Sequence, residues 1–234
     1  MPVDDRRAWE IVLAHIEADL LGGRLGPGDR LPGERALAAD LGVGRSSVRE
    51  AIRVLEVLGL IRTAVGSGPS AGAIIVALPG GGMSALMRLQ VAAQGFPVAD
   101  VVKTRLVLEA SVVTELADAP SRPDLAGSDA LLDVMESQEL TEAEFLALDA
   151  QFHISLAEAS GNQVVTAMMA GLRSAIEGYA RAGAAGLVSW PATSARLMRE
   201  HRAILAAIAG ADAEAARLAV RSHIVGYYAE THLS

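Results

Sequence analysis

The stretch that decides the fold of the N-terminal part is residues 31–63, LPGERALAADLGVGRSSVREAIRVLEVLGLIRT. Its apolar residues recur at helical spacing on both sides of a tight turn, Gly42-Val43-Gly44. The spacing predicts a short helix over 34–41 and a longer helix that begins at residue 46 or 47 and ends near 58. Two helices joined by such a turn form a helix-turn-helix, in which the second helix enters the major groove of DNA.

The segments on either side of this motif complete a small domain. Apolar spacing predicts a first helix over 9–21, and two short apolar runs at 60–63 and 73–77 predict strands around a glycine-rich loop. The longer motif helix also carries Ser47 and Glu50 at the spacing of a capping box. A helix-turn-helix followed by a β-hairpin is a winged helix-turn-helix.

The residues expected to contact DNA gather at the groove-facing end of the second motif helix, at the start of the first, and in the wing. Arginine can bind a guanine edge with two hydrogen bonds or hold a phosphate, and glycine lets a backbone approach the minor groove. Any one of the arginines alone would more often be an ordinary solvated side chain, but four on one motif favour DNA contact. The predicted contacts are Arg35, Arg45, Ser46, Ser47, Arg49 and Gly66.

The formal net charge of the 234-residue chain is −8, yet its distribution suits a nucleic-acid partner. Residues 30–62 hold six Arg against four Asp or Glu, whereas residues 79–234 hold eleven Lys or Arg against eighteen acids. Phosphate contacts are local and salt screens distant charges, so an arginine cluster on an acidic body still suits DNA. The balance predicts weak non-specific binding and reliance on two such modules, that is, a homodimer on a double-stranded DNA operator.

The composition excludes several other classes of protein. The chain has no cysteine, so disulfide and thiol chemistry are excluded and a reducing cytoplasm is expected. The polar N-terminus has no signal-peptide core, and no apolar run is as long as a membrane span. No membrane partner is therefore expected.

The winged domain is assigned to residues 1–78, and a linker is expected over 79–83 because Pro79 is followed by three glycines. Residues 84–234 show only helical periodicity, which predicts an all-α antiparallel bundle. The predicted fold class is mainly α, with three helices and a hairpin wing in the first domain. The helices expected in the second domain are 84–93, 98–118, 122–138, 142–158, 162–182, 193–209 and 212–231.

Three helices of the bundle each place a histidine on an apolar face. Asp149 and His153 lie at i and i+4 on one helix, and His201 and His223 lie on the last two. A single such histidine is usually a hydrogen-bonded core residue, but a buried Asp149 also needs a cationic partner. Three imidazoles and a carboxylate suit Zn²⁺, Ni²⁺, Mn²⁺ or Fe²⁺. The residues alone leave a metal site and a metal-free polar core both open, and they favour the metal.

The helix-turn-helix sequence resembles the motif of GntR-type bacterial transcription regulators. The resemblance rests on a Pro-x-Glu-Arg start, a glycine turn, and Val-Arg-Glu-Ala followed by Leu-x-x-x-Gly-Leu, and it implies DNA contacts by Arg35, Arg45 and Arg49. The sequence departs from the family pattern at Gly33 and Gly44, where serine is usual. The departures remove an N-cap oxygen and a phosphate contact. The matching positions are Pro32, Glu34, Arg35, Gly42, Arg45, Val48, Arg49, Glu50, Ala51, Leu55, Gly59 and Leu60.

Four segments of the bundle resemble the effector domain of the FadR-type subgroup of these regulators, the FCD domain. They are TRLVLEASVVTELA at 104–117, DAQFHISLAEASGN at 149–162, REHRAILAAIAGAD at 199–212 and RSHIVGYY at 221–228. The resemblance implies a divalent metal bound beside the ligand. Its ligands would be Asp149, His153, His201 and His223.

The same resemblance assigns roles to three further residues. It implies that Arg105 points into the ligand cavity, where it would hold a carboxylate, and that Glu109 is a structural acid. The alternative for Arg105 is a surface ion pair with Glu109 at i+4. Asn162 either caps the next helix, the role that we favour, or borders the pocket and binds the effector.

These features together predict a homodimeric transcription regulator, a repressor by default, whose operator affinity is set by a small carboxylate metabolite. The effector can act only if it binds two poses of the DNA-binding domains with different affinity. The alternatives are a metal sensor in which the ion is the signal, a metal-dependent enzyme, and a plain structural bundle. An enzyme is not expected, because the pocket stripes carry no separate general base and the DNA module would be idle.

Overall fold

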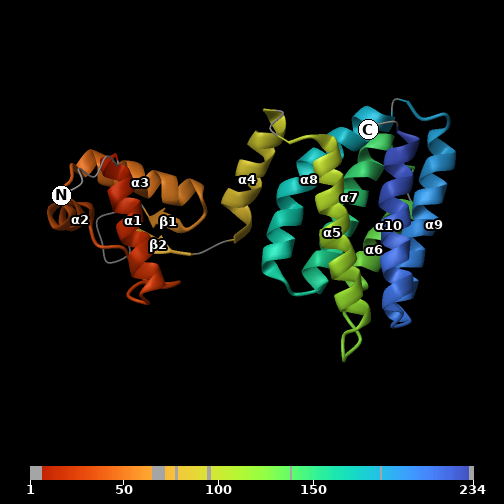
Figure 1. Cartoon of the computed structure of the whole chain (residues 1–234), viewed down its shortest axis with the longest axis horizontal. Coiled ribbons are helices and arrows are strands. Elements are labelled where there is room, and N and C mark those ends of the chain that lie inside the picture. The colour runs from red at the N-terminus through yellow and green to blue at the C-terminus, as the bar shows by residue number, and fades with distance from the viewer. Residues whose placement is uncertain are drawn as a thin grey trace. The chain divides into compact units, whose positions relative to one another are not determined.

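The computed structural model of the chain is mainly helical, which confirms the predicted fold class (Figure 1). It describes residues 7–64, 72–76, 79–93, 96–137, 139–184 and 186–231. These residues contain ten α-helices and one two-stranded antiparallel sheet. The chain divides into two compact units, residues 1–83 and 84–234.

The first unit has the predicted winged helix-turn-helix architecture. β1 and β2 pair antiparallel, with Ile61 opposite Ile75. The predicted helices and hairpin are all present, and their limits differ from the predicted ones by a few residues at most. The elements are α1 (Ala8–Leu21), α2 (Glu34–Leu41), α3 (Arg45–Val57), β1 (Ile61–Ala64) and β2 (Gly72–Ile75).

One hydrophobic core joins the elements of the first unit. α1 contributes Val12 and Ile16, α3 contributes Val48 and Leu55, and β2 contributes Ile75. Because Val48 and Leu55 recur on one face of α3, that face is buried and the opposite face lies in solvent. The core therefore decides which residues of α3 are available to a partner.

The start of α3 differs from the prediction. The helix begins at Arg45, with Gly44 as an N-cap in extended conformation and no side-chain cap. Ser47 is therefore the third residue of the helix and does not cap it. Glycine is tolerated here because it weakens an N-cap by only roughly a few tenths of a kcal/mol relative to serine. As predicted, Gly42 ends α2, and its φ of 64° lies in the left-handed region that favours glycine.

Residues 79–83, predicted as a flexible linker, instead begin α4 (Pro79–Ala92). Proline is favoured in the first turn of a helix, because its missing N–H would have no partner there. A side chain at Gly82 would overlap the backbone of Leu58 within the first unit. The glycine that suggested flexibility therefore provides close packing.

The second unit is the predicted all-α bundle. α10 lies between α5 and α9, and α7 packs against both α6 and α8 (Figure 1). Short connections join consecutive helices, as the breaks in periodicity predicted. The helices are α5 (Val98–Ala117), α6 (Ala126–Ser137), α7 (Glu142–Ala159), α8 (Gln163–Ala184), α9 (Trp190–Ala209) and α10 (Ala213–Glu230).

In this unit, the starts of α6 and α9 differ from the predicted ones by more than one residue, and local hydrogen bonds explain both. α6 starts at Ala126, whose N–H donates to the side chain of Asp124. α9 starts at Trp190, because Ser189 caps it and Pro191 lies in its first turn. Within the described residues, no helix is long and apolar enough to span a membrane.

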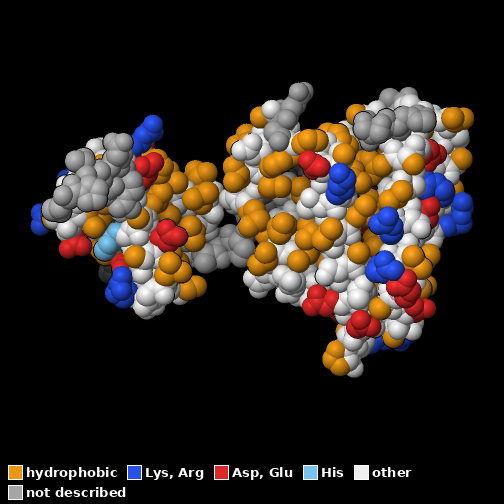
Figure 2. All heavy atoms as spheres, in the orientation of Figure 1, with side chains coloured by type: hydrophobic (Ala, Val, Ile, Leu, Met, Phe, Trp, Pro, Cys, Tyr) orange, Lys and Arg blue, Asp and Glu red, His pale blue; other side chains and the backbone are white. Residues whose placement is uncertain are grey.

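The surface of the second unit is divided between apolar and charged regions. On the face seen in Figure 2, hydrophobic side chains gather over α4 and α5, whereas charged side chains gather over α9 and α10. Leu86 and Leu89 on α4 and Val107 on α5 are all more than half exposed. Exposed apolar side chains grouped in this way are typical of a surface that another molecule covers.

Candidate nucleic-acid interface and candidate metal centre

The residues predicted to contact DNA lie on the solvent face of the first unit. Arg35, Arg45, Ser46 and Arg49 are exposed, and Ser47 is half-buried. Their exposure follows from the core, which takes the opposite face of α3. Gly66, the predicted contact in the wing, lies outside the described residues.

Glu34, for which the sequence suggested no DNA-related role, contacts two of these arginines. Its Oε2 accepts a hydrogen bond from Arg49 Nε at 2.9 Å and lies 3.8 Å from Arg45 Nη2. The arginine side chains remain 53% and 59% exposed, respectively. An ion pair this exposed contributes little to stability. It does restrict where the two guanidinium groups point.

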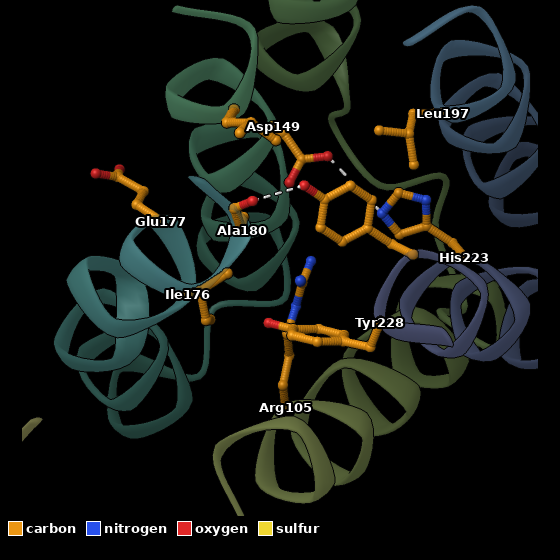
Figure 3. Close-up of a pocket in the computed structure, with 10 residues that line it drawn as sticks. Arg105, Asp149, Ile176, Glu177, Ala180, Leu197, His223 and Tyr228 are labelled. Atoms are coloured by element: carbon orange, nitrogen blue, oxygen red, sulfur yellow. Dashed lines mark hydrogen bonds and ion pairs between the residues drawn. The ribbon is translucent and has the colours of Figure 1, made fainter. Parts of the chain in front are cut away.

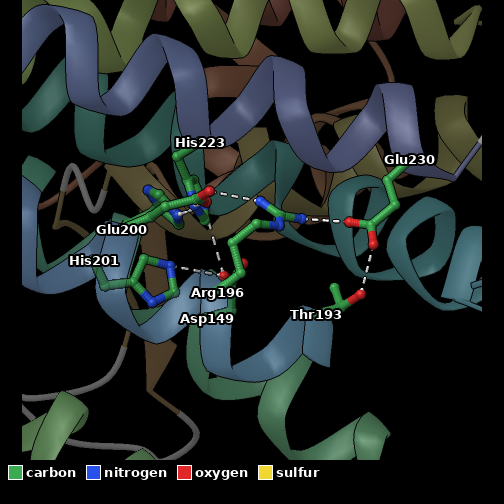
Figure 4. A network of polar contacts seen from close by, with 8 residues as sticks. Asp149, Thr193, Arg196, Glu200, His201, His223 and Glu230 are labelled. Carbon is green, nitrogen blue, oxygen red and sulfur yellow. Dashed lines mark hydrogen bonds and ion pairs between the residues drawn. The ribbon is translucent and has the colours of Figure 1, made fainter. Parts of the chain in front are cut away.

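The four residues predicted to bind a metal come together in the core of the second unit. α7 supplies Asp149 and His153, α9 supplies His201, and α10 supplies His223, and all four are buried. One potential ligand atom from each lies within 4.8 Å of the others. Figure 4 shows Asp149, His201 and His223 facing one another.

The distances within the cluster suit a shared metal ion. His201 Nε2 lies 3.0 Å from Asp149 Oδ1, and His153 Nε2 lies 3.1 Å from His223 Nε2. Ligand atoms about 2.1 Å from one ion and roughly at right angles are about 3.0 Å apart. His201 Nε2 has no partner among the described residues other than Asp149, and His201 Nδ1 is buried without a hydrogen bond among them. A metal ion would bind the Nε2 atoms and the Asp149 carboxylate at the same time, which is how buried imidazoles and a buried carboxylate are satisfied together.

Carboxylates hold the outer nitrogens of two of the histidines. His153 Nδ1 lies 2.5 Å from Glu109 Oε2, and His223 Nδ1 lies 3.0 Å from Glu200 Oε2. Such contacts fix the ring and leave Nε2 to face a metal. Sequence reasoning noted Glu109 only as a structural acid and missed Glu200. No sequence signal identifies Glu200, because its contact depends on how α9 packs against α10.

A chain of polar contacts continues from Glu200 toward the end of the bundle (Figure 4). Arg196 Nη1 donates to Glu200 Oε1 at 2.6 Å, and Arg196 Nη2 pairs with Glu230. The hydroxyl of Thr193 donates to the other oxygen of Glu230 at 2.7 Å. These contacts join α9 to α10 on the side of His223.

The electrostatics favour an ionised Asp149 and neutral His201 and His223. Burial alone would raise the pKa of Asp149, but close contact with His201 and the neighbouring imidazoles hold that pKa below its ordinary value. Burial lowers the pKa of His201, and it lowers the pKa of His223 further with the help of the other imidazoles. An ionised carboxylate and neutral imidazoles are the forms that bind a metal.

A small cavity lies beside the cluster, and Arg105 lines it together with Asp149 and His223 (Figure 3). Its volume is about 10 Å³, which is room for a single water molecule. Tyr227 closes one side, where its hydroxyl donates to the Ala180 carbonyl of α8 at 2.9 Å. The Tyr228 hydroxyl is buried without a hydrogen bond among the described residues.

Arg105 makes the predicted ion pair with Glu109, but the pair is buried and does not lie on the surface. Burial alone would raise the pKa of Glu109, but Arg105 and then His153 lower it to about 2. Arg105 Nη2 has no hydrogen-bond partner in the described part of the chain. The guanidinium is therefore held at one edge by Glu109, and its other edge lies beside the Tyr228 hydroxyl.

Asn162 lies away from the cavity. It is exposed, and its side-chain oxygen accepts a hydrogen bond from the N–H of Val165 at 3.2 Å. Asn162 thus caps α8, which was the favoured alternative. Because it is not among the residues that line the cavity, its assignment as an effector-binding residue is not supported.

Comparison with known families accounts for both units. Residues 10–69 match the bacterial regulatory proteins of the gntR family, and residues 100–226, more than half of the chain, match the FCD domain. The chain belongs to the GntR family. Its second unit contains an FCD domain, and the buried Asp-His cluster lies within that domain.

Named relatives of this GntR protein are transcription regulators and not enzymes. The transcriptional regulator LutR of Bacillus subtilis is 31% identical over 89% of this chain and 97% of its own length. The transcriptional repressor NanR of Cronobacter sakazakii is 31% identical over 71% of this chain. The chain spans only 64% of the length of that NanR.

A solved structure shares the fold. The GntR protein of Streptococcus agalactiae superposes with a TM-score of 0.64 at 24% sequence identity, covering 94% of this chain and 97% of that chain. The likeness extends over both units.

Proposed function

We propose that this GntR protein is a DNA-binding transcription regulator, and specifically a repressor that releases its operator when a small organic acid binds. The observation that carries the proposal is the exposed set Arg35, Arg45 and Arg49 on a winged helix-turn-helix. The N-terminal end of α3 presents Arg45 and Arg49 as a recognition helix does. The repressor name of one relative supports the sign of regulation.

Fluorescence anisotropy with the DNA upstream of the protein's own gene tests DNA binding. We expect specific binding that weakens as salt rises, and a strong loss of specific binding in Arg49→Ala. Arg217→Ala is the matched control, because it removes the same charge from an exposed arginine of the second unit. Binding that is sequence-blind, or equally weakened by both variants, contradicts the proposal.

The operator is proposed to be read by a homodimer. Leu86 and Leu89 on α4 and Val107 on α5 are exposed apolar side chains, and a second copy would cover them. Two winged domains would then require two half-sites at matching spacing. Analytical sedimentation measures the oligomeric state in solution. We expect a dimer for the wild type and a monomer for the double variant Leu89→Glu with Val107→Glu. A monomeric wild type contradicts the proposal.

The FCD domain is proposed to hold a divalent metal through Asp149, His153, His201 and His223. The ion would supply a positive charge to which an acid can bind. Arg105 would bind the acid's carboxylate through the edge away from Glu109. The Tyr228 hydroxyl, which lies beside Arg105, would contact the same ligand.

The size of the cavity links binding to regulation. At about 10 Å³ it does not admit an organic acid, so the helices or side chains that line it must move when one binds. Such a movement lets the acid distinguish two poses of the protein, which is what control of operator affinity requires. A thermal-shift screen of small carboxylic acids, with and without chelator, tests this step. We expect stabilisation by one chemical class that is lost with chelator and in Arg105→Lys. Stabilisation that Arg105→Lys leaves unchanged contradicts the role of Arg105.

The same small volume favours a second candidate, in which the metal itself is the signal. Operator affinity would then track free metal with no acid present. Anisotropy across a series of Zn²⁺ concentrations separates the two candidates. A metal response without acid supports the sensor, and an acid response at constant metal supports the acid-responsive repressor.

A further inference from the structure

We propose that Glu109 couples the carboxylate site to the metal site, because a single carboxylate holds both Arg105 and His153. The inference rests on the proposed function, in which Arg105 binds the effector acid and His153 binds the metal. Glu109 would touch neither the acid nor the metal. It is therefore a positioning residue. It would raise the affinity for the metal ion when the acid is bound, and the affinity for the acid when the metal ion is bound.

The geometry places Glu109 between two groups with different tasks. Its Oε1 pairs with Arg105 Nε, and its Oε2 lies 2.5 Å from His153 Nδ1. Arg105 and Glu109 are only 5% and 4% exposed, and His153 is 1% exposed. Glu109 Oε2 and His153 Nδ1 have no other hydrogen-bond partner among the described residues. Water cannot replace either contact, so a change at one end of the carboxylate reaches the other.

The link to the acid runs through the two edges of the guanidinium. Glu109 occupies Arg105 Nε, whereas Nη2 is buried without a partner in the described part of the chain. Figure 3 shows the guanidinium pointing toward Asp149 and His223 across the cavity. An acid that accepts from Nη2 satisfies a buried donor. It does so only while Glu109 keeps the guanidinium in place.

The link to the metal runs through the imidazole. With Nδ1 held by Glu109, His153 turns Nε2 toward the cluster, 3.1 Å from His223 Nε2. A carboxylate on the outer nitrogen makes an imidazole a stronger metal ligand. When the carboxylate of an acid pairs with Arg105, it offsets the positive charge of the guanidinium. The negative charge of Glu109 is then less compensated by Arg105 and interacts more strongly with His153. Acid binding therefore strengthens metal binding, and the metal must strengthen acid binding by the same factor.

Glu200 provides a matched control within the same site. It contacts His223 Nδ1 at 3.0 Å, and it has its own arginine partner, Arg196, at 2.6 Å. Arg196 is not among the residues that line the cavity. Both carboxylates should therefore support metal binding, but only Glu109 should transmit the presence of an acid.

The test measures Zn²⁺ affinity of the full chain by competition with a chromophoric chelator. Acetate is the carboxylate probe, and chloride replaces it at equal ionic strength in the reference. We expect acetate to raise the Zn²⁺ affinity of the wild type. Glu109→Gln and Glu200→Gln should each lower Zn²⁺ affinity about 10- to 100-fold. Only Glu109→Gln should lose the acetate effect.

The outcomes separate this inference from the proposed function. A wild type that binds no Zn²⁺ overturns the proposed metal site itself. A wild type that binds Zn²⁺ without an acetate effect, or a Glu109→Gln variant that keeps the effect, overturns the coupling alone. Thermal unfolding of the metal-free variants is measured alongside. If Glu109→Gln does not fold, Arg105→Lys replaces it, and persistence of the acetate effect in that variant overturns the coupling.

Discussion

The first unit keeps its functional charges in solvent, and the second unit buries them. Arg45 and Arg49 are more than half exposed although both contact Glu34. Arg105 and Glu109, by contrast, are almost completely buried. Exposed charges are solvated whether or not they are paired, whereas buried charges depend on every partner. The same kind of substitution should therefore have very different effects in the two units.

The largest effect is expected where a buried ion pair loses its cation. Arg105→Met leaves Glu109 charged in the core with only His153 beside it, which should lower the free energy of unfolding by about 3–5 kcal/mol. Urea denaturation followed by circular dichroism measures it. Arg105→Met combined with Glu109→Met removes both charges and should recover most of the loss. If the free energy of unfolding of Arg105→Met lies within about 1 kcal/mol of the wild-type value, the pair contributes no more than an exposed ion pair, which contradicts the prediction.

Removal of one ligand from the buried cluster should have the next largest effect. His223→Ala should weaken Zn²⁺ binding by more than about 100-fold, because losing a ligand costs more than losing an outer-nitrogen partner. Calorimetric titration measures the affinity. His15→Ala is the control, since His15 lies in the first unit and pairs with Asp19. Equal affinity in both variants would exclude His223 as a ligand.

Acid should destabilise the metal-free protein through its buried imidazoles. The pKa values of His201 and His223 are lowered in the folded state, chiefly by burial. Below pH 6.5 the unfolded chain takes up protons that the folded chain refuses, so stability is present above that pH and is lost as pH falls. Each neutral histidine should cost up to about 1.4 kcal/mol per pH unit. Urea denaturation from pH 8 to pH 5.5 measures the slope, which should become shallower in His201→Ala. The same slope in both proteins would contradict the assignment.

The smallest effect on stability is expected in the first unit. Glu34→Gln should change the free energy of unfolding by less than about 1 kcal/mol, because the pair with Arg49 is exposed. It should nevertheless tighten non-specific DNA binding and steepen its salt dependence by about one phosphate contact, because Arg45 and Arg49 lose a competing anion. Anisotropy on random-sequence DNA at several salt concentrations measures both. An unchanged salt slope would mean that Glu34 does not compete with phosphate.

Sequence periodicity predicted what depends on a single helix face. Asp149, His153, His201 and His223 each fell on an apolar stripe, and burial of those stripes brings them together. The exposed arginines of α3 followed in the same way, because Val48 and Leu55 occupy the opposite face.

Contacts between elements could not be predicted in this way. The contact of Glu200 with His223 joins two helices whose packing the sequence does not record. Glu34 reaches Arg49 across the helix-turn-helix turn. The prediction of a flexible linker at Gly82 was wrong for a related reason. Composition indicated flexibility, but the glycine is required because its backbone approaches Leu58 closely.

The hydrogen bond from Tyr227 to the carbonyl of Ala180 sets a condition on the effector. It joins α10 to α8 at the wall of a cavity with room for one water, so an occupant that separates these two helices gives up this bond. The loss is worth about 1 kcal/mol. An acid must return at least that much through its own contacts before it binds. Affinity will therefore rise with the number of polar contacts that an acid makes and not with its charge alone.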